Sequence, residues 1–347
     1  MRTPLYSVLA LEPLPRCSVS RATAINDKGQ VIGYSHNEET DEAIACLWED
    51  GKVHDLGRIA VNSINNKGQI VGERFNASCH FCAILMENRR PRNLFQNNTP
   101  ISGAKGINDA GQVVGYAQTP LTKSDWPPVM KRGAFCWERG KRHNLDIPVG
   151  YLGGKAKCIN DHGQVIGEVW EDYPGDGHAA LWDRGKAIVI EKPPGFNSSS
   201  ALAINNNGSI LMRASQSNMS ALLKGLQKDG EQPDVVSQIV LKQQSFLLKN
   251  GQMYAISGLT NALNNSDQVV GWSGVDCDDD VLSGRRPSRE PNAIVWQNGE
   301  AADLNTLIPN DSGWHLTRAD GINNHGQVVG KGIHNGHTRA FLLTPIR

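Results

Sequence analysis

The chain has 347 residues, and its 35 lysines and arginines balance its 35 aspartates and glutamates. This balance excludes a strongly electrostatic nucleic-acid binder. No apolar run approaches the about 18–20 residues of a membrane helix, so we expect no membrane contact. Seven cysteines at irregular spacing argue against a disulfide framework. Because residues 1–12 lack a basic leader and a cleavage site, we expect a cytoplasmic protein, with non-classical export left open.

From the N-terminus onward, one phrase recurs along the whole chain. Its first copy is INDKGQVIG at residues 25–33, and the copies that begin at 204 and 263 are degenerate. Internal repetition at this period indicates one structural unit used many times, not two separate domains. The copies begin at Ile25, Ile64, Ile107, Ile159, Ile204, Leu263 and Ile322.

A second phrase follows each copy of the first. It is ACLWEDGK at residues 45–52, and the copies at 83–86 and 245–251 are degenerate. Four copies keep a tryptophan at the same place, at positions 48, 137, 182 and 296. Each unit therefore consists of two related halves.

Turn residues divide each unit into four short apolar runs. In the turn Asn26–Gly29, the asparagine can bond to its own backbone and the glycine can adopt positive φ, which favours a type I turn with a glycine bulge. The turn Glu49–Gly51 contains the same kinds of residues and is predicted to have the same geometry. Each unit is therefore predicted to be two hairpins, which together form a four-stranded antiparallel meander.

Both faces of these strands are apolar, as in Val31–Tyr34. A sheet with one wet face would alternate apolar and polar residues, so both faces must be packed. This predicts an all-β, seven-bladed β-propeller with sheets stacked around an axis. We expect glycines such as Gly33 to let neighbouring sheets approach, and the tryptophans to fill the wider gap further out.

The two ends of the chain predict a closed ring. Residues 314–343 supply only three strands, and the run 6–11 is otherwise unpaired, so it would complete the last blade and remove an exposed edge. The whole chain, 1–347, is then one domain with an insertion in blade 5 at about 213–244. Residues 220–224 are an alternative third strand of that blade, which would leave 238–256 as an extra hairpin.

These residues resemble the HAF-repeat (extracellular repeat) family, whose pattern is A-x-x-I-N-x-x-G-x-V-x-G followed by A-F-x-W-x-x-G. The resemblance extends from Tyr6 to Leu343. It implies the repeated fold and little chemistry, and the family name implies export.

The connections between the predicted strands differ on the two faces of the disc. The turns between strands 1 and 2 and between strands 3 and 4 are uniformly short, whereas the loops between strands 2 and 3 vary and are long in blades 3, 5 and 6. Rigid scaffolds place recognition on variable loops. The predicted binding residues on that face are Trp126, Trp170, Asp172, Tyr173, Trp272, Asp278, Asp279, Arg285, Arg286 and Trp314.

Three groups that could hold a metal have simpler explanations. The carboxylates of 276–280 lack the spacing of a calcium loop and suit a solvated loop. The run 79–82 is half a zinc motif without a second half. The repeated asparagines, beginning with Asn26, are explained by turn capping. No nucleophile elbow, P-loop or HExxH motif occurs, so we expect no cofactor, no metal and no catalytic residue.

The sequence therefore predicts a non-catalytic, monomeric binding or scaffold protein whose long loops recognise a macromolecule, most simply another protein. Two alternatives remain open. An enzyme could assemble its site at the channel mouth from several blades. A glycan-binding propeller would need aromatic platforms at equivalent positions, which Tyr34, Tyr116 and Trp272 match but Glu73 and Lys331 do not.

Overall fold

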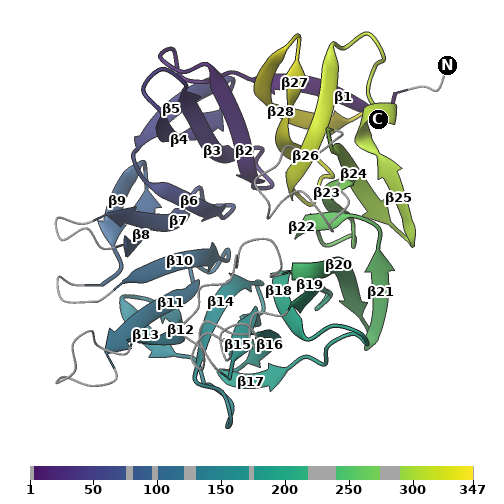
Figure 1. The fold of residues 1–347 in the computed structure, drawn as a ribbon. Helices are drawn as coiled ribbons and strands as arrows, with labels where there is room; N and C mark the ends of the chain where they lie inside the picture. The colour runs from purple at the N-terminus through teal and green to yellow at the C-terminus, as the bar shows by residue number, and fades with distance from the viewer. Residues whose placement is uncertain are drawn as a thin grey trace, which may run out of the picture.

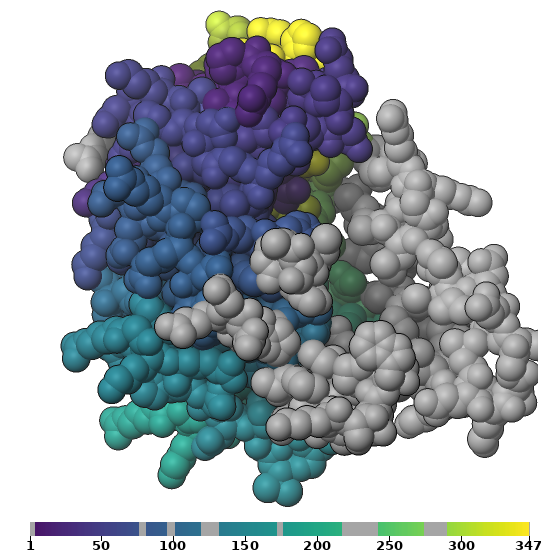
Figure 2. All heavy atoms as spheres, turned by 90° about the vertical axis from the view of Figure 1, so that its left-hand side faces the viewer, coloured from purple at the N-terminus to yellow at the C-terminus, as the bar shows by residue number. Residues whose placement is uncertain are grey.

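The computed structural model describes residues 4–75, 81–95, 101–120, 130–171, 176–217, 240–273 and 290–346. These residues form seven four-stranded antiparallel sheets arranged as blades around a central axis (Figure 1). The predicted seven-bladed propeller is confirmed. Edge on, the early blades follow one another along the side of the disc, from purple through blue to teal (Figure 2).

The blades follow the chain in order. Blade 1 contains β2 (Val19–Ile25), β3 (Val31–Asn37), β4 (Glu42–Glu49) and β5 (Lys52–Gly57), and blade 2 contains β6 (Ala60–Ile64), β7 (Ile70–Phe75), β8 (Phe81–Glu87) and β9 (Arg90–Asn93). Blade 3 contains β10 (Ser102–Ile107), β11 (Val113–Pro120), β12 (Met130–Glu138) and β13 (Lys141–Asn144). Blade 4 contains β14 (Gly153–Ile159), β15 (Val165–Trp170), β16 (Gly177–Asp183) and β17 (Lys186–Val189).

The remaining blades complete the circle. Blade 5 contains β18 (Ser198–Ile204), β19 (Ile210–Ser217), β20 (Val240–Lys249) and β21 (Gln252–Ile256). Blade 6 contains β22 (Leu259–Leu263), β23 (Val269–Ser273), β24 (Asn292–Gln297) and β25 (Glu300–Asp303), followed by the 3-10 helix η2 (Leu304–Thr306). Blade 7 contains β26 (Trp314–Ile322), β27 (Val328–His334), β28 (His337–Pro345) and the N-terminal β1 (Tyr6–Leu11). No helix within the described ranges has the length and apolar character needed to cross a membrane.

The N-terminal strand closes the ring, as predicted. β1 pairs antiparallel with β28 in a register that places Tyr6 opposite Pro345 and Leu11 opposite Ala340. This pairing covers the edge that blade 7 would otherwise expose. The two ends of the chain therefore share one sheet.

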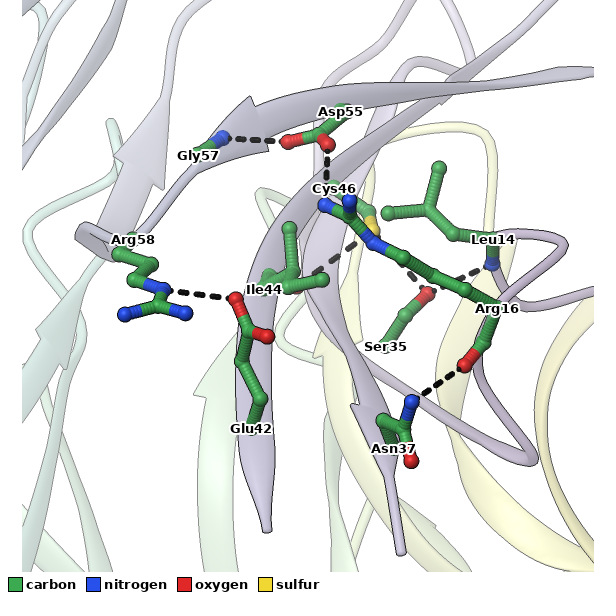
Figure 3. A network of polar contacts seen from close by, with 10 residues as sticks. All are labelled: Leu14, Arg16, Ser35, Asn37, Glu42, Ile44, Cys46, Asp55, Gly57 and Arg58. Atoms are coloured by element: carbon green, nitrogen blue, oxygen red, sulfur yellow. Dashed lines mark hydrogen bonds and ion pairs between the residues drawn. The ribbon is translucent and has the colours of Figure 1, made fainter. Parts of the chain in front are cut away.

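Residues 12–18, which link β1 to β2, form polar contacts with blade 1 (Figure 3). The backbone N–H of Leu14 donates to Ser35 Oγ at 3.0 Å, and Asn37 Nδ2 donates to the Arg16 carbonyl at 2.8 Å. The Arg16 guanidinium lies 2.9 Å from the Asp55 carboxylate on the outermost strand. The link thus contacts three strands of blade 1, β3, β5 and, through Trp48 Nε1 donating to the Glu12 carbonyl, β4.

The core is divided among the blade interfaces. The described residues contain seven apolar clusters, one for each pair of neighbouring blades. Val31 belongs to the cluster between blades 7 and 1, whereas the next residue, Ile32, belongs to the cluster between blades 1 and 2. Consecutive residues of one strand therefore pack on opposite neighbours, which explains why the second strands do not alternate.

The four repeated tryptophans pack as predicted. They lie on the third strands of their blades and are at most 5% exposed. Two of them also bond outside their strand, since Trp48 and Trp182 donate through Nε1 to the carbonyls of Glu12 and Asp146.

The predicted role of the repeated glycines was wrong. A Cβ on Gly33 would lie 2.0 Å from the Arg21 carbonyl oxygen, which belongs to the paired strand of the same blade. The other five glycines show the same conflict at 1.8 to 2.0 Å, and the innermost strand is bulged beside each of them. The glycine therefore accommodates a bulge inside its own blade instead of bringing two sheets together. Blade 5 has Met212 at this position.

The first turn was predicted correctly, and the second was not. Gly29 has a φ of +78° and its N–H donates to the Asn26 carbonyl, as a type I turn with a glycine bulge requires. In the second turn, Asp50 and Gly51 both have positive φ between the paired residues Glu49 and Lys52. This is a two-residue type I′ hairpin, which matches the twist of its strands better than a repeat of the first turn would.

Strand pairing also settles blade 5. β19 pairs with β20 and β20 with β21, so the chain from 240 to 256 supplies the third and fourth strands and is not an extra hairpin. Residues 220–224 lie outside the described residues. In blade 7 the connection between the second and third strands is short, because β27 and β28 meet at a turn formed by Asn335 and Gly336.

Candidate functional site

The antiparallel blades give the disc two different faces. The first and last turns of each blade share one face, where Gln30 Nε2 donates to Glu49 Oε1 at 2.5 Å, and we call it the turn face. The connections between second and third strands, together with the links between blades, share the other, which we call the loop face. The innermost strands of the seven blades surround the central axis, and we call the region between them the channel.

An asparagine ring closes the channel wall at the turn face. Asn26 Oδ1 accepts from the backbone N–H groups of Lys28 and Gln30, which caps its own turn. Its Nδ2 donates to the Asn65 carbonyl of the next blade at 2.9 Å. The same link is repeated from blade to blade until Asn323 donates to the Asn26 carbonyl at 3.0 Å. The ring consists of residues 26, 65, 108, 160, 205, 264 and 323.

A second ring, which we call the Asx ring, follows it by one residue. The backbone N–H of Asp27 donates to Asn66 Oδ1 at 2.8 Å, and the circle closes where the N–H of Asn324 donates to Asp27 Oδ1 at 2.8 Å. Both rings line a polar pocket of about 210 Å³. Each side chain in these rings bonds to a neighbouring turn, so this end holds the blades together. The Asx ring consists of residues 27, 66, 109, 161, 206, 265 and 324.

The loop-face half of the channel is charged instead. On the second strand of each blade, the position after the repeated glycine holds Tyr34, Glu73, Tyr116, Glu168, Arg213, Trp272 or Lys331, and the innermost strand adds further charges opposite them. Basic residues predominate strongly over acidic ones. The basic channel cluster consists of Arg21, Lys105, Arg132, Lys155, Lys157, Arg213, Arg318 and Lys331, and its acidic members are Glu73, Glu168 and Asp320.

Ion pairs connect this cluster across its blades. Arg318 Nε lies 2.6 Å from Asp320 Oδ1, and Arg21 Nε of the next blade lies 3.6 Å from Asp320 Oδ2. The Asp320 side chain is only 6% exposed, whereas those of Arg318 and Arg21 are 30% and 41% exposed. The Asp320 carboxylate therefore lies beneath Arg318 and Arg21, which are the more exposed charges of this group.

On the other side of the cluster, carboxylates are likewise paired with basic residues. Lys105 pairs with Glu73, and Lys157 Nζ lies 2.9 Å from Glu168 Oε2. Burial acts to raise the pKa of Glu168, but Lys157, Ser200 and Lys155 together hold that pKa below its usual value. Glu168 is therefore ionised at neutral pH and already neutralised by a lysine.

Two lysines of the cluster, Lys155 and Lys331, form no ion pair with a carboxylate of the described residues, although Glu168 favours the charged form of Lys155, and Asp320 and Glu290 favour that of Lys331. Burial, reinforced by Lys105 and Lys157, lowers the pKa of Lys155 to about 8. Burial also lowers the pKa of Lys331, and Arg21 and Arg318 act in the same direction. Burial is the largest cause for both lysines, and the neighbouring cations add a positive potential that an anion would relieve.

Aromatic rings contact several of these cations. The guanidinium of Arg318 lies 4.0 Å from the Trp272 ring centroid, and that of Arg213 lies 5.9 Å from it. Tyr116 is contacted in the same manner by Arg132 at 4.8 Å and by Lys155 at 5.3 Å. Cation–π contacts of this kind hold basic groups in place without neutralising them.

An apolar pocket adjoins the cluster on the loop face. It lies between blades 1 and 2, has a volume of about 630 Å³, and shares Glu73 and Tyr34 with the channel. Phe75 and Phe81, which are 61% and 37% exposed, face each other at its edge with ring centroids 4.1 Å apart.

The structure places three of the residues predicted for binding. Trp272 contacts Arg318 and Arg213 of the basic channel cluster. Trp170 is buried, with its Nε1 against Gly153, and Trp314 stacks on His334 at 4.6 Å, so each packs in its own blade. The predicted residues that lie outside the described ranges are Trp126, Asp172, Tyr173, Asp278, Asp279, Arg285 and Arg286.

The basic cluster was not predicted from the sequence, because the position after the repeated glycine was considered only for aromatic residues. A count of charge at that position and at the innermost strands, such as Arg21, Lys155 and Arg318, would have found it. Among the residues that the structure describes, no group of three His, Cys, Asp or Glu side chains is placed to hold a metal ion.

No family model matches this chain, and no curated protein sequence matches it either. Solved structures match its fold. The β-propeller domain of the Trilobed protease from Pyrococcus furiosus, described as having an open velcro topology, is 10% identical with a TM-score of 0.52, and the match covers 94% of each chain. Here, in contrast, β1 and β28 close the ring.

Two peptidases are similar over part of their length. An acylaminoacyl peptidase from Pyrococcus horikoshii is 10% identical with a TM-score of 0.54, over 94% of this chain and 52% of that one. A puromycin-hydrolyzing peptidase from Mycobacterium tuberculosis is 10% identical with a TM-score of 0.55, over 99% of this chain and 55% of that one. The chain thus spans about half the length of these two peptidases. At this identity the likeness is one of fold alone, that of a seven-bladed β-propeller.

Proposed function

We propose that this protein is a non-catalytic binding protein that holds an acidic segment of a partner protein at the loop-face mouth of its channel. The observation that carries the proposal is the basic channel cluster, in which eight basic residues face three acidic members and the neighbouring Glu290, in a chain of zero net charge. A neutral protein that gathers positive charge at one mouth has a local site for an anion.

A protein is favoured over other anions by what surrounds the cluster. The exposed Phe75–Phe81 pair and its pocket lie beside the channel and would pack apolar side chains of a partner. Carboxylates on the same segment would reach Lys155 and Lys331, which have no carboxylate of their own in the described part of the chain. Charged and apolar groups together suit a peptide better than a simple anion.

The glycan alternative has less support. Tyr116 is only 8% exposed and is covered by cations, and the hydroxyl of Tyr34 accepts from the Val61 N–H at 2.9 Å. The Tyr116 ring therefore does not offer the open face on which a sugar stacks.

We further propose that the chain is a member of the HAF-repeat family, on the strength of its seven repeated phrases. The asparagine ring gives that proposal a structural test, since its residues are those of the repeated phrase. A crystal structure of a family member should contain the same ring, and a structure with another fold would contradict the assignment.

The binding proposal is tested with a fluorescein-labelled glutamate-rich peptide followed by fluorescence anisotropy. We expect binding that weakens as salt is raised, because the interaction is electrostatic. The double variant Lys155→Gln/Lys331→Gln should bind about thirtyfold more weakly, since each of the two lost contacts to a charged group contributes on the order of 1 kcal/mol.

A matched control removes the same charge elsewhere. Lys52→Gln/Lys141→Gln alters two exposed lysines on the outermost strands of blades 1 and 3 and should bind the peptide as the wild type does. An equal loss of affinity in both double variants would indicate a non-specific charge effect and would overturn the proposal, as would an absence of binding by the wild type.

A further inference from the structure

Lys105, Arg132 and Lys155 lie around the Tyr116 ring, and Lys157 follows Lys155 by two residues on β14. The three lysines are not equivalent. Lys105 pairs with Glu73, and Lys157 pairs with Glu168 and donates to Ser200 Oγ at 2.5 Å. Lys155, which lies opposite Glu168 on β14, forms neither an ion pair nor a hydrogen bond through its amine with any residue of the described ranges. Its Nζ instead lies 5.3 Å from the Tyr116 ring centroid.

The groups that face Lys155 come from several strands and are mostly cationic. Lys105 on β10 and Lys157 on β14 disfavour its protonated form, Glu168 on β15 favours that form less strongly, and Arg132 on β12 disfavours it to the smallest extent. Burial has the largest effect, and together they lower its pKa to about 8. At pH 7.5 about a quarter of Lys155 is therefore free amine, compared with about one in a thousand for an ordinary lysine.

We propose that Lys155 is a site of covalent modification by anionic aldehydes, which react with its amine to form an imine. The amine nitrogen attacks the carbonyl carbon, the carbon–oxygen π electrons move to oxygen, and the carbinolamine then loses one water molecule to leave a carbon–nitrogen double bond. No oxidant or reductant is needed. An unprotonated lysine amine beside other cations is the arrangement in which such nucleophiles occur.

The neighbouring cations would select the reagent. Lys105, Lys157 and Arg132 surround the amine and would hold a phosphate or carboxylate group while the aldehyde carbon lies against Lys155. A neutral aldehyde would gain nothing from them. This inference uses the same cations as the proposed function but requires no acidic partner segment.

The test is labelling of the full chain with pyridoxal 5′-phosphate at pH 7.5, followed by borohydride reduction and peptide mapping by mass spectrometry. Lys155 should be labelled at least about tenfold faster than exposed lysines such as Lys52 and Lys141, which follows from its larger fraction of free amine. Glyoxylate, which carries a carboxylate, serves as the second anionic reagent, and uncharged pyridoxal as the neutral one.

Preference of Lys155 for either anionic reagent over pyridoxal supports the inference and identifies phosphate or carboxylate as the group that is held. Labelling spread evenly over the exposed lysines, or equal reaction with pyridoxal, would overturn it. In Lys155→Gln the fast site should disappear, and in Lys141→Gln it should persist.

A second variant tests the role of the neighbouring charge. Lys105→Gln removes one cation and leaves Glu73 without its partner, and both changes favour protonated Lys155. The pH at which Lys155 is half-maximally labelled should move upward, with slower labelling at pH 7.5, and an unchanged profile would contradict the inference.

The two proposals can fail separately. Rapid labelling of Lys155 without binding of the glutamate-rich peptide would remove the proposed function and leave this inference. Peptide binding without selective labelling of Lys155 would remove this inference and leave the proposed function.

Discussion

The two ends of the channel are built from the same seven repeats, yet they are chemically different. At the turn face, every blade contributes an asparagine that caps its own turn and bonds to the next blade. At the loop face, the equivalent positions hold an aromatic residue, an acid or a base in different blades, with bases in excess.

The comparison separates what the fold needs from what it does not. Positions of the asparagine ring are identical because each makes the same contacts, and a different residue there would leave buried donors and acceptors unpaired. The positions near Lys155 and Lys331 gather like charges, which costs stability. Residues that the fold does not require, and that weaken it, are the ones expected to serve binding.

Loss of ring closure should have the largest effect, because both ends depend on it. Deletion of residues 1–12 removes β1, with the buried side chains Tyr6 and Leu11, and exposes the edge of β28. We expect a loss of about 3–6 kcal/mol in the free energy of unfolding. Chemical denaturation measures it, and an unchanged midpoint would mean that β1 contributes little to closure.

Damage to the asparagine ring should be the next largest. Asn160→Ala removes the cap that accepts from the His162 and Gln164 N–H groups and the link to the Asn205 carbonyl. We expect a loss of about 2–3 kcal/mol. The exposed Asn144→Ala serves as the control, and it should alter stability by no more than about 0.5 kcal/mol. If the two variants lost the same free energy of unfolding, an asparagine of the ring would contribute no more to stability than an exposed one.

Removal of basic residues at the loop-face end should not lower stability at neutral pH, unlike the two changes above. The pKa values of Lys155 and Lys331 are lowered in the folded protein, so the unfolded chain binds more protons between about pH 8 and pH 10.5. Wild-type stability should therefore gain about 1 kcal/mol from these groups over that range, after allowance for their partial exposure.

The variant Lys155→Gln/Lys331→Gln should lose this gain and be no less stable than the wild type at pH 7. Denaturation of both proteins at pH 7.5 and pH 10 measures their stability near neutral pH and the gain between the two pH values. A double variant that is markedly destabilised at pH 7 would place these lysines among the structural residues.

The smallest effect concerns the one ring residue with a clear pKa shift. Burial acts to raise the pKa of Asp27, but hydrogen bonds from Asn324 and Asn66 outweigh it and lower that pKa. The carboxylate therefore stabilises the fold at neutral pH, and this contribution is lost as the pH falls through the folded-state pKa. Asp27→Asn should be less stable by about 1 kcal/mol at pH 7 and should lose less stability on acidification, and parallel acid profiles would contradict this.

The fold could be predicted from the sequence because its signals are local. The turn Asn26–Gly29, the apolar run after it and the repeated tryptophan each specify a few neighbouring residues, and repetition does the rest. The unpaired run 6–11 predicted the closure for the same reason.

Contacts between blades could not be predicted in this way. The Nδ2 donor of Asn26 bonds to the Asn65 carbonyl, a partner that becomes adjacent only when the blades are stacked. The role of Gly33 was misassigned because the bulge opposite it is a property of the folded strand pair.

The candidate site was predicted least well. Trp272 was selected as an aromatic residue near a long loop, but its chemistry depends on Arg318 and Arg213 of the two neighbouring blades. A zero net charge for the whole chain concealed the local excess of basic residues. Charge counted along the sequence does not show which charges meet around the channel.

The most direct test of the account is the location of a bound acidic peptide. A glutamate-rich peptide with a photo-crosslinker at one end would be bound, irradiated and mapped by mass spectrometry. The account predicts cross-links near Trp272 and Lys331, at the loop-face mouth of the channel. Cross-links at Asp27 and Asn66, on the turn face, would contradict it.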